Sequence, residues 1–183
     1  MQQELKKIVG IGVTLRPITF EDTALIIKWR NNTEVMKNFI FQEIFTEEMH
    51  KNWMQTRVLT GKVIQYIIED NTTQQPIGSV YIRDIDNVHQ SAEYGIFIGE
   101  NAARGKGYGT ETAKLFVEYM FKYLNLHRIF LRVLDGNDAA CKSYEKAGFV
   151  KEGVFHDMVK INGVYRDVIF MAKINKKEVI ENE

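Results

Sequence analysis

The stretch from Ser91 to Glu111 constrains the fold most, because an apolar run passes into a glycine-rich turn and then into a helix. The turn reads Arg104-Gly105-Lys106-Gly107-Tyr108-Gly109-Thr110, with three glycines in five residues. Glycine allows a ligand to approach the backbone closely, and the first turn of a helix carries unpaired N–H groups and partial positive charge. The stretch therefore predicts a phosphate cradle, to which Arg104 and Lys106 add charge.

Two common phosphate-binding motifs do not fit this turn. A dinucleotide-binding loop requires G-x-G-x-x-G, and its third glycine would fall at Thr110 or Thr112. A P-loop requires G-x-x-x-x-G-K-[ST], which the turn does not contain. What fits is Arg-x-x-Gly-x-Gly, at Arg104, Gly107 and Gly109. A helix-entry loop with only a structural role is the alternative interpretation.

A second motif lies downstream, where residues 137–149 read N-x-x-A-x-x-x-Y-E-K-x-G-F. In order and spacing, the two motifs resemble the cofactor motifs of the Gcn5-related N-acetyltransferase superfamily. The resemblance covers roughly Leu15 to Ala172. Within the superfamily, the chain looks most like the branch of ribosomal-protein N-terminal, polyamine and amino-sugar acetyltransferases.

The resemblance implies the acyl-CoA N-acyltransferase fold. This is an α/β (α+β) architecture in which a mixed, largely antiparallel sheet of about seven strands carries helices on both faces, and two central strands separate to admit the cofactor. The patterns of apolar residues agree, because they predict strands at 13–18, 63–69, 77–83, 92–98, 127–134, 150–160 and 164–172. Helices are expected to begin at Thr19, Thr46, Thr110 and Asn137.

The resemblance also implies acetyl-CoA as cosubstrate, and no metal is expected. The residues expected to bind the cofactor are Phe97, Ile98, Arg104, Gly105, Lys106, Gly107, Tyr108, Gly109, Thr110, Asn137 and Tyr144. For Asn137, a role as the N-cap of the following helix is equally compatible with the sequence.

Two residues are expected to carry the proton transfers. Tyr144 resembles the tyrosine that lies near the cofactor sulfur, where a phenol can protonate the departing thiolate; the alternative is an aromatic ring packed on the sheet. Glu93 lies on the strand before the turn, where the branch often has a glutamate, and is expected to act as general base and to contact the acceptor amine. Its alternative is an exposed strand carboxylate. Glu43, Asp84 and Asp86 are secondary candidates for the base.

The acceptor site has a weaker signature, the tripeptide Trp29-Arg30-Asn31. Similar tripeptides occur in amino-sugar acetyltransferases of this branch, so all three residues are candidates for substrate binding. The alternative is that Trp29 packs in the core and Arg30 is a solvated charge. His50 is expected on the surface of a helix, with a place in the acceptor site as its alternative.

Composition limits the other possibilities. The chain has 183 residues, 45% of them hydrophobic, with 24 basic and 24 acidic residues and a formal net charge of zero. We therefore expect one domain over residues 1–183, with a core at about 13–172 and a loose tail at 178–183. Zero net charge argues against nucleic-acid or membrane partners. The single cysteine, Cys141, rules out an intramolecular disulfide, and no apolar stretch suits a signal peptide or membrane span, so a cytoplasmic location is expected.

The sequence thus predicts an acetyl-CoA-dependent N-acetyltransferase in which a primary amine attacks the thioester directly. The expected acceptor is a small molecule, preferably an amino sugar. The alternatives are a protein or peptide N-terminal amine and a polyamine. A non-catalytic acetyl-CoA sensor is the alternative from a different functional class, and a homodimer is a possible assembly.

Overall fold

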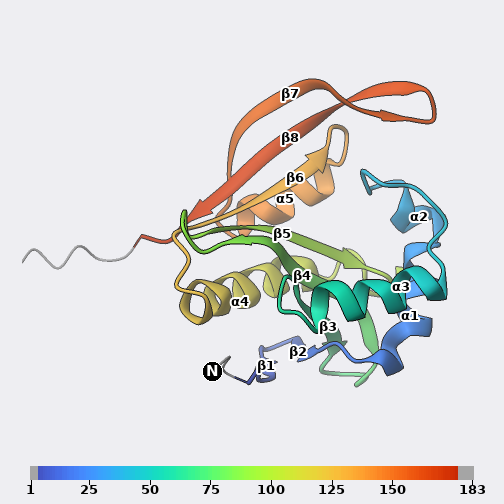
Figure 1. The fold of residues 1–183 in the computed structure, drawn as a ribbon, viewed down its shortest axis with the longest axis vertical. Helices are drawn as coiled ribbons and strands as arrows, with labels where there is room; N and C mark the ends of the chain where they lie inside the picture. The colour runs from blue at the N-terminus through green and yellow to red at the C-terminus, as the bar shows by residue number, and fades with distance from the viewer. Residues whose placement is uncertain (1–3, 177–183) are drawn as a thin grey trace, which may run out of the picture.

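The computed structural model describes residues 4–176 (Figure 1), so the tail expected at 178–183 lies outside the described residues. One eight-stranded sheet runs through the structure in the order β1-β2-β3-β4-β5-β6-β8-β7. The strands are β1 (Ile8–Val9), β2 (Val13–Pro17), β3 (Ile64–Asp70), β4 (Pro76–Asp86), β5 (Ser91–Ile98), β6 (Arg128–Leu134), β7 (Val150–Ile161) and β8 (Val164–Ile174). The α-helices are α1 (Thr23–Arg30), α2 (Thr33–Met36), α3 (Glu47–Trp53), α4 (Tyr108–Tyr123) and α5 (Asp138–Lys146).

The predicted architecture is confirmed, with one strand more than expected. All neighbouring strands pair antiparallel except β5 and β6, which are parallel. The added strand is β1, which pairs Ile8 with Leu15 and Val9 with Thr14 of β2. Two residues are too few to show the alternation by which a strand is recognised in a sequence.

Apolar side chains form a separate core on each face of the sheet. On one face, α4 presents a stripe of buried residues that includes Ala113, Phe116 and Met120. On the other face, Ile26 and Trp29 of α1 pack with side chains from β3 and β5. Successive residues of a strand point to opposite faces, so the central strands contribute to both cores and the helices cover both sides (Figure 1).

The last two strands form a long twisted ribbon at the far edge of the sheet (Figure 1). Its turn is Asn162-Gly163, and both residues adopt positive φ angles, 50° and 83°. That is the backbone geometry required by a two-residue hairpin turn matched to strand twist. The sequence prediction for this hairpin is therefore confirmed.

Candidate functional site

The centre of the site is a wedge, the opening between β5 after Glu93 and β6 after Phe130. The parallel pairing of these strands covers only Ser91–Glu93 opposite Arg128–Phe130, although both strands continue beyond it. Over the unpaired part, β5 remains paired with β4, and β6 with β8. The sheet therefore stays intact on both sides of the wedge while a strip of β5 backbone is left open toward β6.

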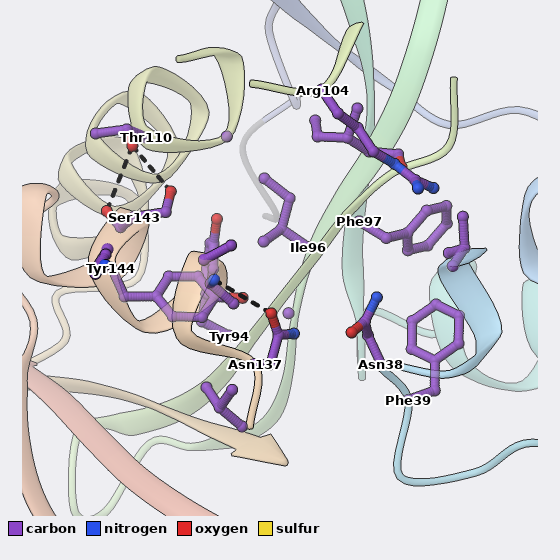
Figure 2. A pocket seen from close by; sticks show the side chains of 18 of the residues that line it. Asn38, Phe39, Tyr94, Ile96, Phe97, Arg104, Thr110, Asn137, Ser143 and Tyr144 are labelled. Carbon is purple, nitrogen blue, oxygen red and sulfur yellow. Dashed lines mark hydrogen bonds between the residues drawn. The ribbon is translucent and has the colours of Figure 1, made fainter. Parts of the chain in front are cut away.

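A cavity of about 870 Å³ extends along the wedge. Figure 2 shows its two sides. The glycine-turn side consists of residues 103–105, 107–110, 136–140, 142–144 and 146, which come from the turns before α4 and α5, the first residues of α4, and α5 itself. The α1 side consists of Arg30, residues 34, 35 and 37–41, Tyr81 and Arg83. The exposed strip of β5, from Glu93 to Ile98, lies between them.

The glycine-rich turn leads into α4 with two residues in the left-handed region. Gly105 has φ +75° and Gly107, the N-cap of α4, has φ +86°. No other atom lies within 4 Å of the position that a Cβ would occupy on either residue. At Gly109 the nearest atom is the Ser143 hydroxyl, 3.6 Å away. Open space beside free helix N–H groups fits a phosphate cradle.

The polar side chains of the turn are used mainly to hold its shape. The Arg104 Nε donates to the carbonyl of Ile98 at 3.2 Å, which ties the turn to the end of β5. The Tyr108 hydroxyl donates to Asp70 at 3.0 Å, and the Thr110 and Ser143 hydroxyls share a hydrogen bond of 2.9 Å that joins α4 to α5. Of the turn residues expected to bind the cofactor, Lys106 alone is outside the cavity lining; its side chain is exposed to solvent.

Asn137 and Tyr144 come from the second motif and lie on the glycine-turn side (Figure 2). The Asn137 Oδ1 accepts a hydrogen bond from the Ala140 N–H at 3.3 Å. The N-cap role is thus present, and because Asn137 also lines the cavity, its amide nitrogen is available to a ligand. Tyr144 packs edge-on against Tyr94 of β5, with ring centroids 6.0 Å apart.

The Tyr144 hydroxyl is held in its protonated form. Burial raises its pKa, and the nearby Tyr81 and Cys141 add to the shift. The phenol therefore stays protonated at neutral pH. Within residues 4–176 no side chain or backbone group hydrogen-bonds to this hydroxyl, so its proton is free for a group bound in the cavity.

Glu93 lines the cavity, but its surroundings do not suit a general base. Its carboxylate is buried, with 5% of the residue exposed, and receives hydrogen bonds from Arg83 at 3.1 and 3.2 Å and from Arg132 at 2.9 and 3.0 Å. Burial acts to raise the pKa of Glu93, but the hydrogen bonds from Arg132 and Arg83 outweigh it and lower the pKa. A carboxylate that is so strongly stabilised as an anion is a weak base.

The three side chains of the Trp29-Arg30-Asn31 tripeptide, expected at the acceptor site, have different surroundings. Trp29 is fully buried, and its ring covers Gly99 so closely that a Cβ there would lie 2.1 Å from the Trp29 Cγ. The Asn31 side chain donates to the carbonyl of Phe45 and accepts from its N–H, at 2.9 and 2.7 Å. Trp29 and Asn31 are therefore structural residues outside the cavity lining, and only Arg30 faces the cavity.

Three residues that line the cavity from neighbouring strands were not predicted from the sequence. Tyr81 of β4 lies over Gly95, so that a Cβ on Gly95 would be 2.4 Å from the Tyr81 hydroxyl. Arg83 and Arg132 flank Glu93 from β4 and β6. Strand pairing brings these residues together, and no local sequence motif predicts that they are neighbours. The alternation of Tyr81 and Arg83 on one face of a strand was the only available signal.

The secondary carboxylates lie elsewhere. Glu43 and Asp84 are exposed, and Asp86 accepts hydrogen bonds from the backbone of Val88 and His89 in a surface turn. None of the three lines the cavity.

In residues 4–176, no group of three or more His, Cys, Asp or Glu side chains is placed to hold a metal ion. Nor does this part of the chain contain a helix long and apolar enough to cross a membrane.

Comparison with known proteins agrees with the geometry. Residues 13–150 match the family model described as Acetyltransferase (GNAT) domain. The spermidine N(1)-acetyltransferase of Vibrio cholerae is 31% identical over 177 residues, which cover 93% of this chain and 98% of that protein.

Two solved structures of the Vibrio cholerae spermidine N-acetyltransferase resemble the fold closely. A crystal structure in complex with CoA and spermine has a TM-score of 0.82 at 29% identity, with 89% of this chain and 95% of that one covered. A dodecameric structure in an intermediate state has a TM-score of 0.77 at 29% identity and covers 94% and 99% of the two chains. With the family match spanning most of its length, this chain belongs to the GNAT family and is an acetyl-CoA-dependent N-acetyltransferase.

Proposed function

We propose that the protein transfers the acetyl group of acetyl-CoA to the primary amine of a small molecule by direct attack on the thioester. The observation that carries this proposal is the wedge between β5 and β6, which places an open backbone strip between the glycine-rich turn and a separate α1 side within one cavity. Two substrates can therefore enter from opposite sides and meet at the same strand.

Acetyl-CoA fits the glycine-turn side, because the space beside Gly105 and Gly107 is open and the first N–H groups of α4 point into a phosphate cradle. When bound, it supplies the acetyl group as an activated thioester. The exposed strip of β5 offers backbone N–H groups for the thioester carbonyl, and one such donor is worth about 3 kcal/mol in a transition state. Tyr144 supplies the proton for the leaving thiolate.

Glu93 is a poor candidate for the base, because two guanidinium groups hold its carboxylate. We infer that Glu93 positions Arg83 and Arg132, and that the amine loses its proton to water. An amine with a low pKa, near that of an α-amino group at about 7.8, would lose its proton to water most readily. Turnover of a given amine should therefore rise with pH until the amine is fully deprotonated.

Similarity and sequence motif favour different acceptors. Two relatives that match over more than nine-tenths of this chain are named spermidine N(1)-acetyltransferase, which supports a polyamine acceptor over an amino sugar. The reason for the amino sugar was the Trp29-Arg30-Asn31 tripeptide, and two of its three residues lie outside the cavity. Spermidine is therefore the first acceptor to test.

The test is release of CoA from acetyl-CoA over a panel of amines, with spermidine, amino sugars, their phosphates and nucleotides, and peptides with free N-termini. Detection should be chromatographic, since Cys141 is a free thiol. We expect turnover with one class of amine. Tight acetyl-CoA binding without turnover of any amine would contradict the proposal and favour the sensor function.

We also propose that the protein self-associates. The dodecameric relative supports this, as do the exposed apolar residues of the β7–β8 ribbon, Phe155, Met158, Val164 and Tyr165. Light scattering at assay concentrations should give a mass that is a multiple of the 21.3 kDa chain. Phe155→Lys should shift that mass downward if the ribbon forms the contact.

A further inference from the structure

Arg30 is a cation with no anionic partner, held at the edge of the cavity. It is the last residue of α1, and its guanidinium carbon lies 4.2 Å from the ring centroid of Phe39 and 4.9 Å from that of Phe45. Its Nε is buried without a hydrogen-bond partner, and no carboxylate of residues 4–176 forms an ion pair with it. A buried charge is unfavourable unless it is paired, so an unpaired guanidinium at this position reduces the stability of the folded protein.

The aromatic contacts explain how the side chain is held but not why it is charged. A guanidinium between two aromatic faces gains some cation–π stabilisation. A methionine or leucine would fill the same space without the cost of desolvating a charge, and burial lowers the pKa of Arg30 accordingly. Arg30 lines the cavity, and of its guanidinium nitrogens only Nε is fully buried without a partner.

The surroundings of Arg30 carry an excess of positive charge. Arg83 and Arg132 share the buried carboxylate of Glu93, and Arg83 also lies 3.7 Å from the exposed carboxylate of Asp84 outside the cavity lining. The cavity-lining Glu34 is exposed and paired with Lys37 at 2.6 Å. With Arg30, three guanidinium groups thus line this part of the cavity against one buried carboxylate. A polyamine, positively charged at each nitrogen, would meet repulsion here.

The excess charge lies within reach of the reacting groups. Arg30, Tyr81 and Tyr144 all line the same cavity. Tyr81 in turn covers Gly95 on the exposed strip of β5. A small molecule can therefore place its amine at this strip and a second group on Arg30 in the same cavity.

We propose that the acceptor is a primary amine that also carries an anionic group, a phosphate or a carboxylate, and that Arg30 binds this group. The inference rests on the proposed transferase function and narrows its substrate class. Arginine suits the task because its planar fork binds phosphate or carboxylate oxygens through two parallel hydrogen bonds. In this respect the site departs from the polyamine acceptor for which its relatives are named.

The first test compares matched amines with the wild-type protein. Glucosamine 6-phosphate is compared with glucosamine for the phosphate, and 4-aminobutyrate with its amide for the carboxylate; spermidine is the cationic reference. We expect kcat/KM to be higher for the anionic member of at least one pair by on the order of tenfold to a hundredfold, the worth of a charge-assisted hydrogen-bonded pair. The pair that responds identifies the anion.

The second test replaces the guanidinium. Arg30→Met keeps a long side chain between the two rings and should abolish the preference by raising KM for the anionic amine, while the KM for acetyl-CoA and for the uncharged amine stays the same. Arg30→Lys should restore part of the preference, because it returns the charge without the fork. The matched control is Lys28→Met, which removes a cation from the same helix outside the cavity.

The outcomes separate the two proposals. Equal kcat/KM within both pairs, or a preference that survives Arg30→Met, would overturn the anion site while leaving the transferase function in place. Failure of every amine, spermidine included, to release CoA would count against the transferase function itself. Since the first test needs only the wild-type protein, it decides the inference even if Arg30→Met does not fold.

Discussion

Glu93 and Arg132 are joined by two hydrogen bonds, of 2.9 and 3.0 Å, at the point where β5 and β6 separate. Glu93 belongs to the last residue pair of the parallel ladder, opposite Phe130. Arg83 of β4 binds the same carboxylate from the other side. One buried charge thus connects three strands at the base of the wedge, where backbone pairing ends.

The first prediction concerns this connection. Glu93→Gln should reduce the free energy of unfolding by about 3 kcal/mol, because it leaves two guanidinium groups beside a neutral amide in a largely buried site. Urea denaturation measures the change. The control is Glu152→Gln, whose ion pair with Arg128 joins β6 and β7 at the surface and should cost no more than about 1 kcal/mol.

The same variant tests the role of Glu93 in catalysis. If Glu93 only positions the two arginines, the loss of turnover should follow the loss of folded protein and the change in acceptor KM. A variant as stable as the wild type whose kcat falls by two orders of magnitude or more would instead support the general-base role.

The second prediction concerns Tyr144. Tyr144→Phe should lower kcat by on the order of a hundredfold, the usual contribution of a positioned acid, with the Kd for acetyl-CoA unchanged. Because the pKa of Tyr144 is raised by burial, kcat should show no decrease from loss of the acid up to a pH of about 10, the value for an unperturbed phenol. Tyr165→Phe, on the exposed ribbon, is the matched control. Full activity in Tyr144→Phe would exclude the acid role.

The third prediction distinguishes the effect of the glycine-rich turn on stability from its effect on acetyl-CoA binding. Gly109→Ala lies in α4 at an ordinary helical φ and should leave stability unchanged or raise it by up to about 1 kcal/mol. Its methyl group would enter the cradle, so acetyl-CoA should bind about tenfold more weakly, the equivalent of one hydrogen bond. Calorimetry measures the affinity.

Two further variants complete that comparison. Gly107→Ala should weaken binding and also destabilise the fold by about 1–2 kcal/mol, because alanine disfavours the left-handed region. Gly153→Ala on β7, open to solvent and outside the cavity, should not change the affinity. Unchanged binding in Gly109→Ala would show that the ligand phosphates lie elsewhere.

The sequence was sufficient to predict structural features that are local in the chain. The glycine turn, the N-cap at Asn137 and the position of Tyr144 each follow from residues a few positions apart, because turn geometry and helix periodicity are short-range properties. The predicted strands and helices agree with the structure for the same reason. The two-residue strand β1 was not predicted, because it is held by pairing with β2 and is too short to show an alternation of apolar and polar residues.

The cluster of charges around Glu93 could not be predicted from the sequence, because it depends on strand pairing. Glu93, Arg83 and Arg132 are separated by 10 and 39 residues along the chain, and one carboxylate in a sequence does not reveal that two cations share it. Trp29 and Arg30 are adjacent, but helix geometry turns one into the core and the other to the cavity. A tripeptide does not show which of its side chains a ligand meets.

His50 gives the last prediction, and it also corrects the sequence analysis, which placed it on the surface of a helix. It is fully buried, with Nδ1 3.0 Å from the Thr23 hydroxyl and Nε2 without a partner. Burial lowers its pKa, and the attraction of Asp22 offsets this only in part. The folded protein therefore keeps His50 neutral at a pH where the unfolded chain, with a pKa of about 6.5, already binds a proton.

Stability should consequently fall as the pH is lowered below about 6.5, by up to about 1.4 kcal/mol per pH unit until the folded-state pKa is reached. His50→Gln should lose this part of the dependence, whereas His127→Gln, on the surface, should keep it. Thermal unfolding from pH 7.5 to 5 measures the difference between the curves. The carboxylates with lowered pKa values, Glu93 and Asp22 among them, titrate below this window. Parallel curves for wild type and His50→Gln would therefore mean that His50 is protonated in the folded protein.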